Sequence, residues 1–417
     1  MGIIKLIRRE GRHNIMKKFL IFCVLISFIM LVFATSVCVY AEGFDNTKAL
    51  GIYRNTKFAD IKSASFAVYD CDNEQILTGK DPNKKLPVES LVKIMTVYIA
   101  YEYESLEKIT FDELITTSSQ AAHTPGPTAF ISPGDKFSVR NALYAIIISS
   151  CNDVTIALAE HIAGSENEFV ELMNLHASGL GMTNTKFVDC TGRSDENYTT
   201  ANDLALLLET MVEKHPNYME ISKIKYDEET FRNGTGKFSL ENTNKFLKFV
   251  PDSEGLKLGY SAGAKYCLAT TYKDKDKDRR LIVVLLGAED ENTCYAETRR
   301  IFEYCVANYN YWEIQSDGEF VMDIKVTKGK EKIVGCEIKG EYNIVSTQQE
   351  MKDIERRTEL PESLEAPLEE GDVVGKVIYT LNGEDIYELD IVLTGSVEKA
   401  GWFTIFIRWI LEWFGFA

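Results

Sequence analysis

The stretch that decides the fold is LPVESLVKIMTVYIAY, residues 86–101. Turn residues at 81–83 and Pro87 precede Ser90, and an apolar run follows it, so the pattern predicts a helix over 91–103 that begins beside Ser90. Residues three apart share a helix face, which places Lys93 one turn behind the Ser90 hydroxyl. The helix start would also supply backbone N–H groups and a positive dipole end where an oxyanion could develop.

Ser-x-x-Lys is a weak pattern by itself, because an ordinary N-cap serine followed by a surface lysine gives the same spacing. The chain contains four copies: Ser90/Lys93, Ser105/Lys108, Ser222/Lys225 and Ser396/Lys399. Only the first has a distinctive context, with Ser150-Cys151-Asn152 60 residues later and Lys257-Leu258-Gly259 a further 107 residues on. Ser-x-x-Lys, a Ser-x-Asn-type element and Lys-Thr-Gly form the signature of serine β-lactamases and penicillin-binding proteins.

With these motifs the chain resembles the serine D-alanyl-D-alanine carboxypeptidases, the low-molecular-mass penicillin-binding proteins. Matching blocks occur in the family's order: LPVESLVKIMT (86–96), PGDKFSVRNALYAIIISSCNDVTIALAEHIAGS (133–165), LGMTNTKFVDCTG (180–192), YTTANDLALL (198–207), GLKLGYSAGAKYCLAT (255–270) and LEAPLEEGDVVGKV (364–377). The resemblance implies an α+β, mixed α/β catalytic domain of the β-lactamase-like, penicillin-binding kind, followed by an all-β domain and a terminal amphipathic helix. It also implies removal of the terminal D-Ala from peptidoglycan stem pentapeptides, which limits cross-linking, and covalent inhibition by β-lactams.

The resemblance assigns the acyl-transfer steps to three residues. Ser90 would attack the carbonyl between the two terminal D-Ala residues and form an acyl-enzyme. Lys93 would take the Ser90 proton, for which burial and a nearby cation such as Lys257 must lower its pKa from ~10.4. Ser150 would relay the proton to the departing amine, and water would complete hydrolysis.

The resemblance assigns substrate binding to four residues. Asn152 would hold the peptide backbone of the substrate, and Lys257 would also attract its terminal carboxylate. Tyr260 follows Gly259 on the strand that borders the cleft, so the N–H groups of Ser90 and Tyr260 would form the oxyanion hole. No metal and no cofactor is expected.

The family's Lys-Thr-Gly reads Lys257-Leu258-Gly259 here. The missing Thr hydroxyl normally donates to the substrate carboxylate, and such a hydrogen bond is worth ~1.5–3 kcal/mol. Its loss should therefore slow the reaction about ten- to a hundred-fold. Ser261 is no simple replacement, because strand alternation puts residues 258 and 260 on one face and 261 on the other.

Other departures lie close to the nucleophile: Glu89 stands for the common Ala, Val92 for Thr and Cys151 for Gly. An acid at Glu89 would favour the charged, non-basic form of Lys93. Two functions therefore stay open, an active carboxypeptidase of reduced or altered activity, and a catalytically degenerate fold that binds wall peptides or a protein. The active enzyme is favoured because the polar residues of the three motifs, other than the Thr that Leu258 replaces, are all present: Ser90, Lys93, Ser150, Asn152 and Lys257. A β-lactamase would need a deacylating Glu between the second and third motifs, where no convincing candidate stands.

The pattern between the ends predicts two folded parts. Compact apolar runs at 65–69 and 281–287 indicate strands, and spacing of three and four predicts helices over 91–103, 141–163, 201–213 and 293–308. We expect residues 44–312 to form the penicillin-binding-type serine peptidase domain. Alternation after Asp317 and a hairpin turn at Asn382-Gly383 predict a separate all-β domain over 318–395.

Both ends are apolar. Residues 1–41 combine basic side chains, an apolar run and Val39-Tyr40-Ala41, which predicts a cleaved signal peptide and an exported protein, with an uncleaved anchor as the alternative. Translation could start at Met1 or Met16. Residues 401–417, GWFTIFIRWILEWFGFA, predict an amphipathic anchor helix that lies on the membrane with a polar stripe of Thr404, Arg408 and Glu412, or else a last helix packed on the protein itself.

Composition excludes several other classes. The chain has 417 residues, 63 acidic and 46 basic, with a formal charge of −17, so nucleic acid is not an expected partner. No HExxH, CxxC, Walker A or GxGxxG pattern occurs, which argues against zinc and nucleotide chemistry. Without residues 1–41, which carry six basic and one acidic side chain, 40 basic and 62 acidic residues remain, a charge of −22. Anionic lipid would repel so acidic a chain, so we expect attachment at the outer face of the cytoplasmic membrane to be hydrophobic and insensitive to salt.

Overall fold

The computed structural model describes residues 58–227, 232–233, 236–237, 239–250, 252–274 and 279–413. The predicted signal peptide and most of the first residues of the predicted catalytic domain lie outside this part. Within it, a five-stranded antiparallel sheet has the order β2-β1-β11-β10-β9. Its strands are β1 Ser65–Asp70, β2 Gln75–Lys80, β9 Lys257–Ser261, β10 Lys265–Asp274 and β11 Arg279–Ala288.

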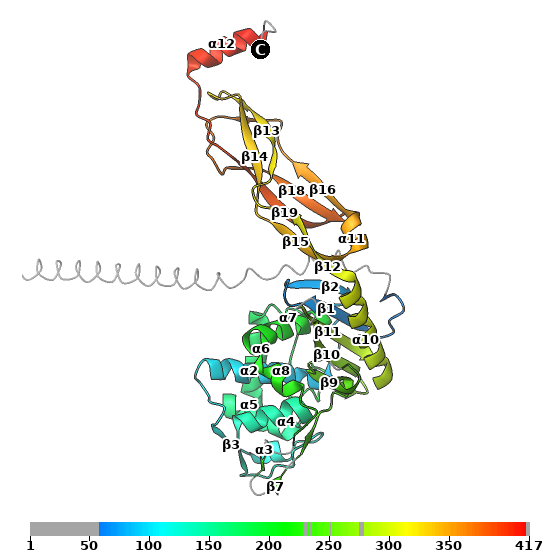
Figure 1. The fold of residues 1–417 in the computed structure, drawn as a ribbon. Coiled ribbons are helices and arrows are strands. Elements are labelled where there is room, and N and C mark those ends of the chain that lie inside the picture. The colour runs from blue at the N-terminus through cyan, green and yellow to red at the C-terminus, as the bar shows by residue number, and fades with distance from the viewer. Residues whose placement is uncertain are drawn as a thin grey trace, which may run out of the picture. The chain divides into compact units, whose positions relative to one another are not determined.

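Alternating side chains of this sheet enter two different cores. Phe66 and Val68 of β1 pack with Phe302 of α10 (Glu291–Asn308) on one face. Ala67 and Tyr69 pack with the helical group on the other. Figure 1 shows α10 and α7 on opposite sides of the sheet. The predicted strands at 65–69 and 281–287 are thus confirmed, and each is buried on both faces because helices cover both.

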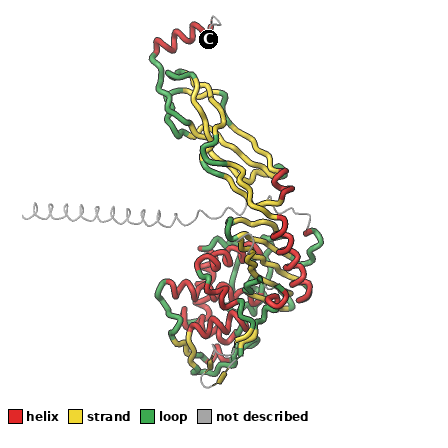
Figure 2. The backbone as a smooth tube through the Cα atoms, in the orientation of Figure 1, coloured by secondary structure: helices red, strands yellow, loops and turns green. Residues whose placement is uncertain are grey.

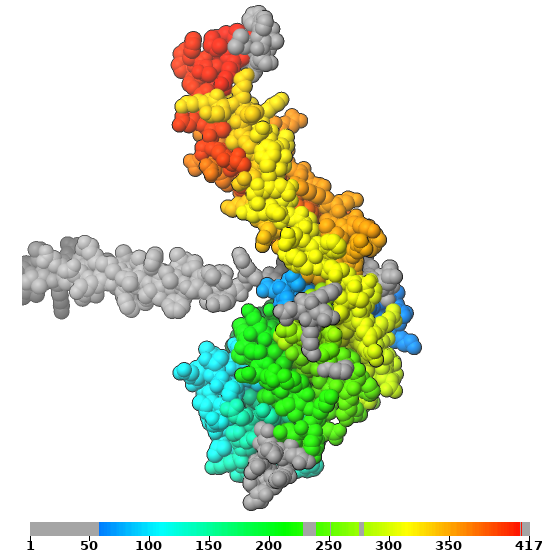
Figure 3. All heavy atoms as spheres, viewed as in Figure 1, coloured from blue at the N-terminus to red at the C-terminus, as the bar shows by residue number. Residues whose placement is uncertain are grey.

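The helical group consists of α2 Val92–Ser105, α4 Val139–Ser149, α5 Asn152–Ala163, α6 Glu166–Gly179, α7 Ala201–Lys214 and α8 Asn217–Ser222. Its atoms, cyan to green in Figure 3, form one continuous mass. Shorter elements connect the group: β3 Leu114–Thr116, α3 Ser119–Ala122, β4 Lys136–Ser138, β5 Tyr226–Asp227, β6 Arg232–Asn233, β7 Gly236–Lys237, β8 Leu240–Glu241 and α9 Phe246–Phe249.

The prediction of one continuous helix over 141–163 is wrong. Helix α4 ends at Ser149, Ser150 adopts a left-handed conformation with φ 59°, and α5 begins at Asn152. A residue with positive φ cannot continue a right-handed helix. The apolar spacing persists across the break because both helices bury their faces in the same core.

The last third of the chain is rich in strands, as expected (Figure 2). β12 Tyr309–Gln315 pairs with β15 Tyr342–Thr347, and a six-stranded sheet has the order β16-β18-β19-β14-β13-β17. Its strands are β13 Phe320–Thr327, β14 Ile333–Lys339, β16 Ile354–Glu359, β17 Ser363–Glu365, β18 Val373–Leu381 and β19 Glu384–Leu393. The only helix described between β12 and β19 is the short α11, Gln348–Asp353. The hairpin predicted at Asn382-Gly383 joins β18 and β19, with φ of 55° and 83° at its two residues.

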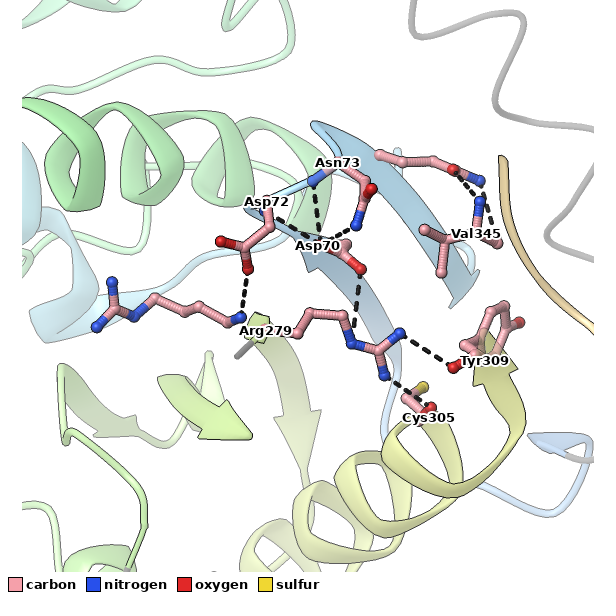
Figure 4. A network of polar contacts seen from close by, with 9 residues as sticks. Asp70, Asp72, Asn73, Arg279, Cys305, Tyr309 and Val345 are labelled. Carbon is pink, nitrogen blue, oxygen red and sulfur yellow. Dashed lines mark hydrogen bonds and ion pairs between the residues drawn. The ribbon is translucent and has the colours of Figure 1, made fainter. Parts of the chain in front are cut away.

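A buried arginine connects the five-stranded sheet to the end of α10 (Figure 4). The guanidinium of Arg279 donates to the carbonyl oxygens of Tyr309 and Cys305 at 3.1 and 3.3 Å. Its Nε lies 3.7 Å from the carboxylate of Asp70, whose side chain is fully buried. Burial raises the pKa of the Asp70 carboxyl, and hydrogen bonds from Asn73 and the charge of Arg279 offset only part of this. The buried Asp70 carboxylate therefore needs Arg279 as its counterion.

Removing one partner tests this dependence. Arg279→Met should lower the free energy of unfolding by about 3–5 kcal/mol, because it leaves the Asp70 carboxylate buried without its counterion. A folded-state pKa above the unfolded value penalises the ionised carboxyl only above the unfolded pKa of ~3.9, so the loss should be smaller near pH 4 than near pH 7. Denaturant titration at both pH values measures it.

Arg357→Met is the matched control, since Arg357 and Asp385 form an ion pair at 2.8 Å with side chains 48% and 58% exposed. We expect less than about 1 kcal/mol for this exposed pair. Equal losses for the two variants would show that burial does not set the strength of the Arg279 pair.

Candidate active site

Ser90 lies in a single 3-10 turn, η4 Glu89–Leu91, that leads directly into α2. Its side chain is buried, and the Lys93 Nζ donates to its Oγ at 3.0 Å. The same Nζ donates to the carbonyl of Thr191 at 2.6 Å. The helix start predicted beside Ser90 is therefore present, and the spacing of three brings the amine to the hydroxyl as expected.

Ser150 reaches Ser90 from a different element. Its Oγ donates to the Ser90 Oγ at 3.1 Å, although the two residues are 60 apart in the chain. The left-handed backbone at Ser150, which breaks the helical stretch, is the conformation in which this contact is made. Ser90, Lys93 and Ser150 thus share one buried hydrogen-bonded cluster, as their assignment to a single site requires.

Asn152 begins α5, two residues beyond Ser150. Its backbone N–H and its Nδ2 donate to the carbonyls of Pro127 and Pro125 at 2.6 and 2.8 Å, which fixes the side chain. Its Oδ1 is buried and has no hydrogen-bond partner among the described residues. A buried acceptor without a donor is costly, so this oxygen is available to a peptide N–H of a bound molecule.

Lys257 is a second buried cation. The side chain is 2% exposed, and its Nζ has no hydrogen-bond partner in the described part of the chain. Burial, and next the charge of Lys93, lower the pKa of Lys257 to about 7. An anion bound at this position would supply the missing partner and stabilise the ammonium form.

Burial also lowers the pKa of Lys93, while the negative charges of Glu89 and Asp189 act against the lowering. The expected adverse effect of Glu89 is therefore present, but burial outweighs it. Lys93 is therefore more readily neutral in this site than a lysine in water. The neutral amine is the form that accepts a proton.

Glu89 occupies an unexpected position. Its Oε2 accepts a hydrogen bond from the N–H of Tyr260 at 3.3 Å and another from the N–H of Ser90. These are the two donors expected to form the oxyanion hole. They come together because β9 approaches η4 closely: a Cβ at Gly259 would lie 3.1 Å from the Ser90 nitrogen. Gly259 therefore leaves the space that this approach needs.

The faces of β9 follow the predicted alternation. Leu258 packs against the core on the α10 side of the sheet, and the ring of Tyr260 lies 4.4 Å from that of Tyr266 on the same side. Ser261 Oγ donates to the carboxylate of Asp195 at 3.3 Å on the other side. Ser261 therefore does not stand where a hydroxyl at position 258 would.

Sequence reasoning assigned no role to the loop around Asp189. The Asp189 carboxylate accepts hydrogen bonds from the N–H groups of Thr191, Gly192 and Ser194 at 2.8, 2.6 and 2.9 Å. Burial alone would raise the pKa of Asp189, but hydrogen bonds from the Ser194 N–H, the side chains of Thr191 and Asn197 and the Gly192 N–H together hold it below its ordinary value. The loop positions the Thr191 carbonyl for Lys93. The sequence Asp189-Cys190-Thr191-Gly192 was a turn signal that could have indicated it.

The fold and the Ser90, Lys93 and Ser150 cluster define a serine enzyme of the penicillin-binding class. The chain matches the D-alanyl-D-alanine carboxypeptidase family over residues 53–290 and the penicillin-binding protein 5 C-terminal domain over residues 309–399. It belongs to the D-alanyl-D-alanine carboxypeptidase family.

Individual relatives agree with this assignment. The chain is 30% identical to the D-alanyl-D-alanine carboxypeptidase DacF of Bacillus subtilis over 400 residues, 95% of this chain and 99% of that protein. It is 30% identical to DacC of Escherichia coli over 85% of this chain and 90% of that protein. Among solved structures, penicillin-binding protein 5 of Haemophilus influenzae is 26% identical with a TM-score of 0.64, over 82% of this chain and 98% of that one.

Gly192 tests how closely the loop constrains the nucleophile. It has φ 88°, and a Cβ there would lie 1.9 Å from the carbonyl oxygen of Glu89. Gly192→Ala should cost about 1–2 kcal/mol for the left-handed backbone and about 1–3 kcal/mol more for the overlap. Because the overlap displaces the turn that carries Ser90, covalent labelling by a fluorescent penicillin should also slow at least about tenfold.

Gly181→Ala is the control, because Gly181 has φ 76° and nothing within 4 Å of its Cβ position. The free energy of unfolding should fall only by the about 1–2 kcal/mol due to the left-handed backbone, and the labelling rate should not change. If Gly192→Ala labels as fast as this control, the loop does not position Ser90.

Proposed function

We propose that the protein is a serine D-alanyl-D-alanine carboxypeptidase that removes the terminal D-Ala from peptidoglycan stem pentapeptides. The observation that carries the proposal is the convergence of Lys93 and Ser150 on the Ser90 hydroxyl, at 3.0 and 3.1 Å in a buried site. A nucleophile in contact with a base and with a second proton carrier has the arrangement that acyl transfer needs.

The reaction consists of acylation of Ser90 followed by hydrolysis of the acyl-enzyme. The Ser90 Oγ bonds to the carbonyl carbon between the two D-Ala residues while its proton passes to Lys93. The carbon–nitrogen bond then breaks, and Ser150 relays that proton from Lys93 to the departing amine of D-Ala. Water attacks the resulting ester, which frees Ser90 and completes hydrolysis.

Substrate binding uses the unpartnered polar groups of the site. The Nζ of Lys257 holds the terminal carboxylate, and the Oδ1 of Asn152 accepts from the peptide backbone of the substrate. The N–H groups of Ser90 and Tyr260 stabilise the oxyanion, with Gly259 leaving room for their approach. β-Lactams acylate Ser90 in the same way. This is supported by similar structures of penicillin-binding protein D2 from Listeria monocytogenes, 26% identical with a TM-score of 0.52, in cefotaxime-bound and ampicillin-bound forms.

Ser90→Ala should abolish both covalent labelling by a fluorescent penicillin and release of D-Ala from a stem-pentapeptide mimic, because it removes the nucleophile. Ser105→Ala is the matched control, since Ser105 opens a second Ser-x-x-Lys sequence but donates only to the Glu102 carbonyl at an exposed site. It should keep both activities.

Failure of the unaltered protein to label or to release D-Ala would contradict the proposal. Labelling without D-Ala release would indicate the degenerate binder instead.

We further propose that the protein is exported and attached to the outer face of the cytoplasmic membrane by α12, Trp402–Trp413. Trp402 is 78% exposed and Phe403 62%, whereas Arg408 donates to the carbonyls of Gly329 and Lys330. Apolar rings that face solvent on a helix with its arginine turned to the protein favour the membrane over self-packing. No helix in the described residues is long and apolar enough to cross a bilayer. The side chain of Glu412, the third member of the predicted stripe, lies outside the described part.

The double substitution Trp402→Ser with Phe406→Ser should reduce binding to phosphatidylglycerol-containing vesicles at least about tenfold. The reason is that it removes exposed apolar area that the membrane would bury. Binding of the unaltered protein should persist in about 1 M salt, where the Debye length is only ~3 Å. Vesicle co-sedimentation measures both.

Phe130→Ser provides the control, because Phe130 is 80% exposed but lies outside the helix. Release of the unaltered protein by salt would show that the attachment is electrostatic rather than hydrophobic.

A further inference from the structure

Glu89 brings a negatively charged oxygen to the place where the reaction creates one. Its Oε2 accepts from both the Ser90 and the Tyr260 N–H groups, and Tyr260 lies 171 residues from Glu89 in the chain. No ion pair of the Glu89 carboxylate is found among the described residues. The carboxylate thus has the same two contacts that the tetrahedral intermediate needs.

We propose that Glu89 is an intramolecular competitor that occupies the oxyanion hole of the resting enzyme and must leave it before Ser90 can be acylated. The inference rests on the proposed function, because the two N–H groups act as an oxyanion hole only if Ser90 is acylated. It makes Glu89 a residue that selects among acyl donors according to how well they bind elsewhere in the site.

The competition follows from hydrogen-bond geometry. A backbone N–H has one proton and makes one good hydrogen bond, so the two donors cannot hold the carboxylate and a substrate carbonyl oxygen together. Hydrogen bonds to a charged acceptor are stronger than those to a neutral carbonyl. An incoming carbonyl therefore does not displace Glu89 by itself, and contacts at Lys257 and Asn152 must contribute.

The side chain of Glu89 can move while its backbone stays in place. The side chain is only partly buried, so the carboxylate has solvent to move into. Its backbone has φ 49°, and its carbonyl faces Gly192, where even a Cβ would overlap at 1.9 Å. The fixed backbone keeps the Ser90 N–H in position when the carboxylate leaves.

Departure of Glu89 also changes the base. Burial lowers the Lys93 pKa, and the Glu89 charge is the largest influence that raises it. Moving the carboxylate into solvent weakens that influence and favours the neutral amine. A substrate that displaces Glu89 therefore frees the oxyanion hole and improves the base in one step.

The test compares Glu89→Ala and Glu89→Gln with the unaltered protein in covalent labelling by a fluorescent penicillin and in D-Ala release. One hydrogen bond to a charged group corresponds to about ten- to a hundred-fold, so Glu89→Ala should label at least about tenfold faster. Glu89→Gln keeps the size and an acceptor oxygen but no charge, and should give an intermediate rate. D-Ala release should rise in the same order.

Glu107→Ala is the matched control, because Glu107 is an exposed glutamate with φ 55°, nearly the backbone conformation of Glu89. It should leave the labelling rate unchanged, which separates loss of the carboxylate from the effect of alanine on a left-handed backbone.

The outcomes distinguish this inference from the proposed function. Ser90 labelling at equal rates in the unaltered protein and both Glu89 variants, or slower in the variants, would overturn the competitor and leave the carboxypeptidase in place. Labelling that appears only when Glu89 is replaced would support the competitor but show that the unaltered protein is not an active carboxypeptidase. Absence of labelling from every variant would overturn both.

Discussion

The site depends on the burial of two lysine side chains next to each other. Lys93 and Lys257 are 1% and 2% exposed, and burial lowers the pKa of both. A single cluster could not hold two ammonium groups without strong repulsion, so one amine is driven toward its neutral form. Ser90 and the Thr191 carbonyl accept from Lys93, whereas Lys257 has no such partner among the described residues. This asymmetry suits one lysine to proton transfer and the other to anion binding.

Positions along a single helix could be predicted from spacing, whereas contacts between distant elements followed only from the family resemblance or were missed. The spacing of Ser90 and Lys93 determines their contact, because one helical turn separates them. The break at Ser150 was missed, since apolar spacing runs through it and a left-handed serine has no distinct sequence signal. The contact of Glu89 with Tyr260 depends on how closely β9 packs against η4, which periodicity does not encode. From the sequence, Glu89 could be predicted to affect the charge of Lys93, but not to contact the oxyanion-hole donors.

The same limit applies to the fold as a whole. Two central strands and four of the helical stretches of the catalytic part followed from apolar patterns, because the sheet is buried on both faces and helices cover it. The strands β2 and β10 and the helices α6 and α8 were not predicted. The Asp189 loop has no periodic pattern, and its order comes from one carboxylate that accepts several backbone N–H groups. Such a loop is specified by hydrogen bonding, which a linear sequence shows only as a turn signal.

Leu258 and Glu89 affect different parts of the same reaction. The resemblance implies that Leu258 lacks the hydroxyl that donates to the substrate carboxylate, so under the proposed function recognition of that carboxylate depends more heavily on Lys257. Under the proposed competition, displacing Glu89 draws on the binding energy of that same contact. An acyl donor that binds Lys257 weakly then has little binding energy with which to displace Glu89 from the oxyanion hole. The effects of Leu258 and Glu89 therefore reinforce each other. Under the proposed competition, discrimination against acyl donors that bind Lys257 weakly is consequently stronger than either residue would cause alone, because the two effects are coupled through Lys257 and are not additive.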